Sequence, residues 1–447
     1  MVAKRYANPN YVLTPLRRVI HKAQYGISLP ATEEPIGLPM IRMNNLQNDG
    51  WDFTDLKYIE LSEEQAELYR VKPGNILFNR TNSKELVGKC EVFRESGDWV
   101  FASYLIRIVL DQTKALPEFV STFLNAKAGR IQINRVSRQI IGMSNVNAEE
   151  LQDLLIPLPS SVEVQRSLVA EIEAARQTQK QKLAQADELF ASTDTYLLEQ
   201  LGIKLSIKPG FVNAQCFGVK RRNVGRRLDP FYSLPEHQVL ETALSDCPSK
   251  VLAIGDRRVV REIVEGRITP KAEFYSEEPK DPIFLRAQNI EKGYLNLSDA
   301  KRLKRDAFEH EPKAILLDGD IVLTIDGVLL GIAAVHRSGD EDCCISNHMV
   351  RIQHGIETDP EYLSWFLNSS AGQRQIKRGI TGSAIPGIRT DAIERILVPI
   401  PPLEVQRSLV TEIEKRRADA QRLRQEAEIE WEAAKTRFEH KLLGEET

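Results

Sequence analysis

Five consecutive residues that follow a β-type run have side chains able to hydrogen-bond the edges of nucleobases. Reading bases requires Arg, Lys, Asn, Gln, Ser or Thr side chains on loops that a rigid scaffold holds in place. The run is Arg80, Thr81, Asn82, Ser83 and Lys84. We therefore treat this segment as a candidate surface for recognising a nucleic acid.

Further polar groups occur in comparable settings along the chain. The second candidate group lies in the loop after a predicted helix, and the second and third groups each occur once in the first half and once in the second. The candidates are Arg138, Gln139, Ser144 and Asn145; Lys377, Arg378, Thr381 and Ser383; Arg42, Asn44 and Asn45; Arg286, Gln288 and Asn289; and, after a second β-type run, Thr324 and Asp326. For each of these residues a role in a turn or a helix cap is an equally good interpretation.

Signals for other chemistry are absent from the sequence. There is no GxGxxG, GxxxxGK[ST] or HExxH motif, and no Cys/His ligand set. Residues 8–11 (NPNY) resemble the catalytic loop of amino-methyltransferases, but the second Pro and a glycine-rich cofactor loop are missing. The five cysteines show no CxxC spacing and are expected to be free, mostly buried thiols. We expect a binding protein without a cofactor or metal of its own.

The chain is a duplication, which determines how the candidate residues are positioned. EVQRSLVAEIE at residues 163–173 and EVQRSLVTEIE at 404–414 differ at one position. Upstream matches keep the same order: PEFVSTFLNAKAG (117–129) with PEYLSWFLNSSAG (360–372), and IRMNNL (41–46) with LRAQNI (285–290). The sequence therefore predicts two copies of one unit, each a globular part followed by a helix.

The two helices are expected to be long and to pair with each other. Apolar or small residues recur every three or four positions from Leu168 to Leu201 and from Leu409 to Phe438, without Pro or Gly. About 40 residues make a helix of roughly 60 Å. A narrow apolar stripe on so long a helix requires a partner helix, so we expect an antiparallel pair.

The globular parts are expected to be α+β. Short β-type runs at 75–78, 320–324, 332–335 and 349–352 accompany one clear helix, 118–125, and its twin, 361–368. Prolines follow the runs 154–156 and 396–398, and we expect them to end those strands and to start the long helices.

Composition is that of an ordinary globular protein, with 447 residues, 42% hydrophobic and 28% charged. The net charge of −3 by itself argues weakly against a nucleic-acid binder. Basic residues are nevertheless clustered, at 220–227 and 301–305 among others, so a basic face on an acidic body is one interpretation and ordinary solvated charge is the other. We expect a cytoplasmic protein because no long apolar run or signal-peptide pattern is present.

The plan of variable domain, long helix, variable domain and long helix resembles the specificity subunit of type I restriction-modification enzymes. The resemblance covers essentially the whole chain. It rests on the helix starts at 157–168 and 399–409, which share P-x-P, two or three further residues and then E-x-Q-R, on the runs GNILFNRTNSKELVGK (74–89) and GDIVLTIDGVLLG (319–331), and on RRLDPFY (226–232). The resemblance implies a pseudo-two-fold α+β fold with two target recognition domains separated by antiparallel coiled-coil helices.

The same resemblance implies partners and domain ranges. We expect target recognition domains at 1–156 and 206–401, and spacer helices at 157–205 and 402–447. Each domain would read one half of a split double-stranded DNA site. The helices would set the spacing and dock two modification subunits, with restriction subunits joining later. The expected docking residues are Gln165, Arg166, Gln406 and Arg407.

S-adenosylmethionine, ATP and Mg are expected on the partner subunits and not on this chain, which would be non-catalytic. Two alternatives remain open. One is a scaffold whose domains bind protein or peptide, which DNA binding by the complex would exclude. The other is an enzyme with an unrecognised site, which activity of the isolated chain would reveal.

Overall fold

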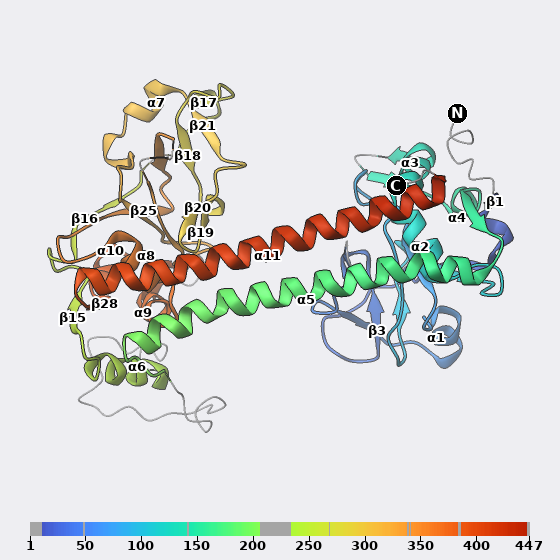
Figure 1. The fold of residues 1–447 in the computed structure, drawn as a ribbon, viewed down its shortest axis with the longest axis horizontal. Helices are drawn as coiled ribbons and strands as arrows, with labels where there is room; N and C mark the ends of the chain where they lie inside the picture. The colour runs from blue at the N-terminus through green and yellow to red at the C-terminus, as the bar shows by residue number, and fades with distance from the viewer. Residues whose placement is uncertain are drawn as a thin grey trace. The chain divides into compact units, whose positions relative to one another are not determined.

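The computed structural model describes residues 11–47, 50–140, 143–205, 234–267, 269–337, 339, 341–382 and 386–444 (Figure 1). The basic run 220–227, the segment 226–232, the NPN residues 8–10 and Ser383 lie outside this part of the chain. The chain divides into two compact units, 1–185 with 423–447 (unit 1) and 186–422 (unit 2). The four predicted domain ranges stay a prediction.

Unit 1 is built around a four-stranded antiparallel sheet in the order β2-β11-β7-β9. Helices α2 and α3 pack on it through Phe119, Phe123 and Ile133, which are at most 1% exposed. A smaller sheet, β10-β3-β6, adjoins it. The bounds are β1 Tyr11–Pro15, β2 Ile20–Tyr25, β3 Leu38–Ile41, η2 Met43–Asn45, β4 Leu46–Gln47, β5 Gly50–Trp51, β6 Lys57–Ile59, α1 Glu63–Tyr69, β7 Ile76–Asn79, β8 Thr81–Asn82, β9 Cys90–Val92, β10 Val100–Phe101, β11 Leu105–Leu110, α2 Pro117–Asn125, α3 Lys127–Val136, β12 Arg138–Ile140, β13 Met143–Asn145, α4 Ala148–Gln152 and β14 Leu155–Pro159.

Unit 2 repeats the main sheet strand for strand, whereas its smaller sheet has four strands in the order β17-β21-β18-β24. Its main sheet has the order β16-β25-β22-β23, and α8 and α9 take the places of α2 and α3. The bounds are α6 Pro235–Ser245, β15 Lys250–Ala253, β16 Val260–Glu265, β17 Tyr275–Ser276, β18 Ile283–Leu285, η7 Ala287–Asn289, β19 Ile290–Glu291, β20 Tyr294–Leu295, β21 Lys301–Leu303, α7 Arg305–Glu309, β22 Ile321–Thr324, β23 Ala333–Val335, β24 Cys343–Ile345, β25 Met349–His354, α8 Pro360–Asn368, α9 Ser370–Gly379, β26 Ile380–Thr381, β27 Gly387–Ile388, α10 Thr390–Ile393 and β28 Leu397–Ile400. The predicted α+β internal repeat is confirmed.

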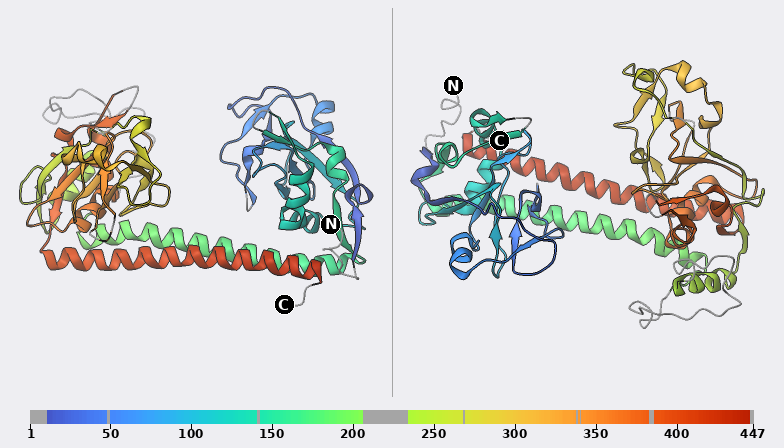
Figure 2. Two further views of the ribbon diagram at one scale, coloured as in Figure 1. Left: turned by 90° about the horizontal axis from the view of Figure 1, so that it is seen from above. Right: turned by 180° about the vertical axis from the view of Figure 1, so that it is seen from behind.

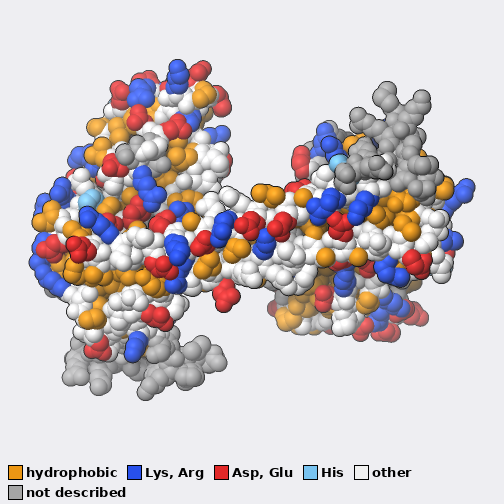
Figure 3. Space-filling model, in the orientation of Figure 1, with side chains coloured by type: hydrophobic (Ala, Val, Ile, Leu, Met, Phe, Trp, Pro, Cys, Tyr) orange, Lys and Arg blue, Asp and Glu red, His pale blue; other side chains and the backbone are white. Residues whose placement is uncertain are grey.

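The long helices are α5 (Val162–Gln200) and α11 (Leu403–Leu443), close to their predicted limits. In unit 1 they run antiparallel, because Glu171 near the start of α5 pairs with Arg437 near the end of α11, and Lys182 pairs with Glu430 (Figure 1). Viewed as in Figure 2, the sheet of unit 1 lies on one side of this helix pair. Side chains of both signs are interspersed along α11 on the face in Figure 3.

Two details differ from the prediction. Leu183 lies on the predicted apolar stripe but is 37% exposed. The prolines do not end the strands, because β14 continues through Pro157 and Pro159, and β28 includes Pro399. Among the described strands, β14 pairs only with β1 and β28 only with β15, so a proline without an N–H is tolerated on the other side.

Candidate nucleic-acid interface

In unit 1 the structure brings two of the predicted groups into one small sheet. Strand β13 pairs with β12 on one side and β8 on the other, which aligns Asn145 with both Arg138 and Thr81. Asn82 lies opposite Ser144. We call the sheet β12-β13-β8 the unit 1 platform. Groups that are about 60 residues apart in sequence therefore form one continuous polar strip.

Side chains of the unit 1 platform bond one another. The Arg80 guanidinium donates to Asn145 Oδ1 at 3.3 Å and lies over the ring of Tyr25 at 4.7 Å. Asn145 Nδ2 donates to Thr81 Oγ1 at 2.8 Å. Ser144 is 1% exposed and belongs to the interior of the platform. Arg80 therefore orders Asn145 and Thr81, and we assign Ser144 a role in the fold.

The loop that follows β8 is partly exposed. Lys84 is exposed, and Asn82 and Ser83 are half-buried. Asn82 Oδ1 accepts from the Ser83 backbone N–H at 2.8 Å, and its amide nitrogen lies 3.8 Å from Met43 Sδ in η2. This contact places the third predicted group, on η2, beside the unit 1 platform.

Helix α3 packs against the loop 83–88 and holds its backbone. Arg130 donates to the backbone oxygens of Val87 and Glu85 at 2.5 and 2.8 Å, and burial lowers the pKa of its guanidinium. Gly88 ends the loop at φ 85°, where a Cβ would lie 2.4 Å from Ile133 Cγ2. The turn therefore requires glycine, and Gly331 occupies the same place in unit 2 with φ 89°.

Arg42 and Asn45 brace η2 from within. Asn45 is 1% exposed, accepts from Arg42 N at 2.9 Å and donates to the Asp52 and Asp55 backbone oxygens. Arg42 pairs with the Asp55 carboxylate at 2.8 Å. Asn44 alone of the predicted trio is exposed. The bonding favours the capping interpretation for Asn45, and we leave it out of the proposed interface.

Unit 2 repeats the brace. Asn289 is 0% exposed, accepts from Arg286 N at 3.1 Å and donates to Asp299 Oδ1 at 3.0 Å. Arg286 donates to the Asp299 backbone oxygen, and the exposed Gln288 donates to the Asp299 carboxylate at 2.8 Å. Asn289 is left out for the same reason as Asn45.

The unit 2 platform consists of β26, β27 and the loop that follows β22. Asp326 and Thr381 both pair with Gly387, so these two predicted residues meet. Thr324 is 0% exposed, and its hydroxyl accepts from Ile332 N at 2.9 Å. Thr324 therefore closes the loop and is left out of the interface.

The remaining predicted residues are exposed or paired at the rim. Lys377 and Thr381 are exposed, whereas Arg378 forms an ion pair with Glu241 at 2.5 Å. Arg138 pairs with Glu150 at 2.9 Å, although its side chain is 74% exposed. The backbone of Gln139 is part of β12. Basic side chains thus gather at the platforms, although the net charge of the chain is negative.

The two glutamines at the helix starts have the same internal role. Gln165 and Gln406 are 0% exposed. Gln165 accepts from Leu116 N at 2.9 Å and donates to Lys114 O at 2.8 Å. Gln406 accepts from Asp359 N at 2.8 Å and donates to the Glu357 and Pro401 oxygens at 2.8 Å. Burial argues against the predicted docking role for both residues.

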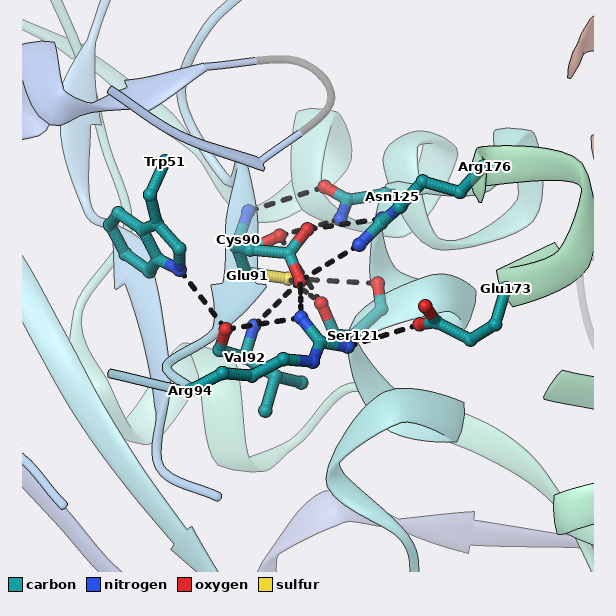
Figure 4. Close-up of polar contacts among 9 residues, drawn as sticks. All are labelled: Trp51, Cys90, Glu91, Val92, Arg94, Ser121, Asn125, Glu173 and Arg176. Atoms are coloured by element: carbon teal, nitrogen blue, oxygen red, sulfur yellow. Dashed lines mark hydrogen bonds and ion pairs between the residues drawn. The ribbon is translucent and has the colours of Figure 1, made fainter. Parts of the chain in front are cut away.

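A buried carboxylate fastens α5 to the sheet of unit 1 (Figure 4). Glu91 on β9 is 3% exposed and accepts from Arg94 at 3.0 Å and from Arg176 at 3.1 and 3.2 Å. Arg94 also pairs with Glu173 at 3.0 Å, and Arg176 lies 5.7 Å from the centre of the Trp431 ring. One cluster therefore joins β9, α5 and α11.

The structure also bears on the cysteines, on metal binding and on membrane spans. The predicted thiols Cys90, Cys343 and Cys344 are buried and Cys247 is half-buried, whereas Cys216 lies outside the described residues. In the part of the chain that the structure describes, no group of three His, Cys, Asp or Glu side chains could hold a metal ion. No described helix combines the length and the apolar character that a bilayer crossing requires.

Comparison with known proteins agrees with this architecture. Residues 255–430 match the model of the type I restriction modification DNA specificity domain. A putative type I restriction enzyme MjaX specificity subunit from Methanocaldococcus jannaschii is 20% identical over 401 residues, covering 88% of this chain and 84% of its own length. Residues 255–430 therefore carry a type I DNA specificity domain, and the chain as a whole is similar to type I specificity subunits. The similar proteins are non-catalytic specificity subunits, and this chain shares their DNA recognition domain.

Two further similarities complete the comparison. The EcoKI specificity subunit of Escherichia coli K12 is 26% identical over 180 residues, which are 40% of this chain and 35% of that subunit. A chain solved in a study of complex assembly and conformational transition of a type I R-M system has a TM-score of 0.57. It shares 15% identity and covers 98% of this chain and 99% of its own, which supports the fold.

Proposed function

We propose that each unit reads one half of a bipartite DNA target, with the unit 1 and unit 2 platforms as the reading surfaces. The observation that supports this proposal is that the two units share one fold but carry different side chains at their platforms. The internal braces repeat residue for residue. The platforms instead present Thr81, Asn82 and Asn145 in unit 1, and Asp326 and Thr381 in unit 2.

The chemistry of the platforms suits two different half-sites. An asparagine amide can bond adenine N6 and N7 at once. The carboxylate at the unit 2 platform can instead accept from a base amino group or hold a neighbouring side chain that contacts a base. The cations around the platforms, Lys84, Arg138 and Lys377, suit phosphate contacts that fix orientation without reading sequence. Unit 1 and unit 2 would therefore prefer different bases.

The duplicated helix starts are the proposed docking sites for two modification subunits. Val164 and Val405 are 41% and 45% exposed, and the neighbouring Arg166 and Arg407 are exposed as well. These residues are identical in the two copies, yet the core of each unit does not bury them. Two equal surfaces suit two copies of one partner.

The helices α5 and α11 belong in part to each unit, so their length would set the spacing of the half-sites. S-adenosylmethionine, ATP and Mg would act on the modification and restriction subunits of a cytoplasmic complex. The partner would also supply much of the attraction for phosphate, because this chain has a net charge of −3. Target DNA should therefore bind better with the partner than without it.

Mapping DNA methylation in cells that contain this chain and its modification partner tests the reading role. We expect one split motif in the presence of the chain and none after its removal. Asn82→Ala should relax one half-site, and Asp326→Ala the other, each by about 1 to 3 kcal/mol per lost contact. Gln112→Ala, an exposed substitution just beyond the other end of β11, is the matched control. A change in both half-sites from Asn82→Ala alone would contradict modular reading.

Partner stoichiometry tests the docking role. Arg166→Glu or Arg407→Glu should each remove one modification subunit, and the double variant both, as seen in the mass of the purified complex. Lys180→Glu, an exposed substitution on α5 outside the duplicated segment, should leave the mass unchanged. A complex of full mass from the double variant would refute docking at these helix starts.

A further inference from the structure

Each unit has one exposed ring side chain at an equivalent position beside its platform, and the fold does not require either of them. Tyr104 directly precedes β11, and His348 directly precedes β25. The backbone oxygen of Tyr104 accepts from Arg80 N at 3.0 Å, and that of His348 accepts from Ile325 N at 3.0 Å. Position 104 in unit 1 therefore corresponds to position 348 in unit 2.

The exposure of these two rings contrasts with their surroundings. The next residues, Leu105 and Met349, are 0% exposed. Tyr104 is 49% exposed, and the His348 side chain is 54% exposed. Neither ring is needed to fill the core, although each directly precedes a central strand of the main sheet. Each ring lies where the chain enters the buried sheet, next to the residues proposed to read DNA.

The imidazole of His348 is held in one orientation by the platform. Its Nδ1 lies 2.8 and 3.0 Å from the two carboxylate oxygens of Asp326. A carboxylate accepts hydrogen bonds, so Nδ1 carries the hydrogen and donates it. This arrangement leaves Nε2 as the ring atom that can bond a ligand, and a fixed ring orientation reduces the entropy lost on binding.

Building on the proposed function, we propose that positions 104 and 348 are specificity-determining positions, with Tyr104 and His348 each contacting a base of its own half-site. Asp326 is then a positioning residue that acts through His348. A phenol and an imidazole differ in size and in hydrogen-bonding atoms, so the same position reads different bases in the two units. The ligand is the groove edge of duplex DNA, where donor and acceptor patterns distinguish base pairs.

The test uses the complex with its modification partner and duplexes that carry the methylated site, each half-site varied one base pair at a time. Tyr104→Ala should lower affinity for the cognate duplex at least about fivefold and alter base preference in one half-site only. His348→Ala should do the same in the other half-site. Gln112→Ala and Ile356→Ala are exposed controls just beyond the opposite ends of the same strands and should change neither.

Because both positions are exposed, Tyr104→Ala and His348→Ala should leave the fold intact, and unchanged melting temperatures of the variants would demonstrate this. Tyr104→Phe, which removes only the hydroxyl, provides a second variant. If the wild-type complex reads a split site and the Tyr104 and His348 variants keep its affinity and base preference, the inference is wrong and the proposed function stands. If the wild-type complex has no sequence preference, both fail.

A double-mutant cycle tests the positioning role of Asp326. Asp326→Ala should lower affinity in the wild-type background and have little further effect in the His348→Ala background. Independent, additive losses would overturn the positioning role, because they would mean that Asp326 contacts the DNA directly.

Discussion

Replacing Arg176 by methionine should loosen the attachment of α5 to unit 1. Methionine preserves most of the aliphatic stem but removes the guanidinium that donates to Glu91 at 3.1 and 3.2 Å. Removing one partner of a buried ion pair costs about 3 to 5 kcal/mol when the remaining charge has no compensation. Glu91 keeps Arg94 and the Val92 N–H, each at 3.0 Å, so we expect a smaller loss of about 2 to 3 kcal/mol.

Urea unfolding of the full chain, followed by tryptophan fluorescence, measures this loss. Three of the four tryptophans, Trp51, Trp99 and Trp431, belong to unit 1, so the signal reports mainly on that unit. The midpoint should fall with little change in slope. Arg94→Met is the matched control, and because its side chain is 41% exposed the loss should be about 1 kcal/mol.

A double variant distinguishes the buried charge from simple loss of packing. Glu91→Met with Arg176→Met removes both charges, so it should be more stable than Arg176→Met alone. A double variant that is less stable than the single one would refute the reasoning, as would a loss below about 1 kcal/mol from Arg176→Met. Base preference should be unchanged in both variants, because the cluster does not belong to the platforms.

Three further predictions concern spacing, pH dependence and thiol reactivity. Inserting about seven residues into both α5 and α11 lengthens the pair by roughly 10 Å, so methylation mapping should show a spacer longer by about three base pairs and unchanged half-sites; an unchanged spacer would contradict the ruler. Burial raises the pKa of the Asp320 carboxyl above its ordinary value near 4. Protonated Asp320 therefore stabilises the fold at pH values below about 4, and this contribution is lost as the pH rises through the raised pKa. Asp320→Asn should therefore gain stability relative to the wild type as pH rises in thermal melts, with Asn75 of unit 1 already making the same backbone bond; a constant difference would refute this. Burial raises the pKa of Cys90 and Cys344 to about 12, so mass spectrometry should find both unalkylated at pH 8 until urea is added, in contrast to Cys247.

Much of the fold could be predicted because the sequence is an internal duplication. A match such as 163–173 with 404–414 reveals the repeat, and apolar spacing over about 40 residues reveals a long helix with one buried face. The antiparallel pairing also follows from the sequence, since each helix has one narrow stripe and only the other helix matches it. The strand limits were less predictable, because whether Pro157 ends a strand depends on how many neighbours the strand has.

The candidate site was predictable only as sets of residues. Sequence placed Asn45, Ser144 and Thr324 on equal terms with Asn44, Asn82 and Asp326, since all are polar residues near strand ends. The structure separates them by burial and by hydrogen-bond partners, which depend on segments far away in the chain. Tyr104 and His348 could have been noticed as the residues before the matching LIRI and MVRI runs, but their exposure was not visible there.

The sequence by itself determined the duplication, the two long helices and the α+β class, because these depend on periodicity and on local similarity. Tertiary structure alone decided that β8 and β13 lie side by side, that Gln165 and Gln406 face inward, and that Asp326 holds His348. Such contacts join residues that are tens of positions apart, and the free energy of burying or exposing each side chain is set by the packed neighbours rather than by the residues beside it in the chain.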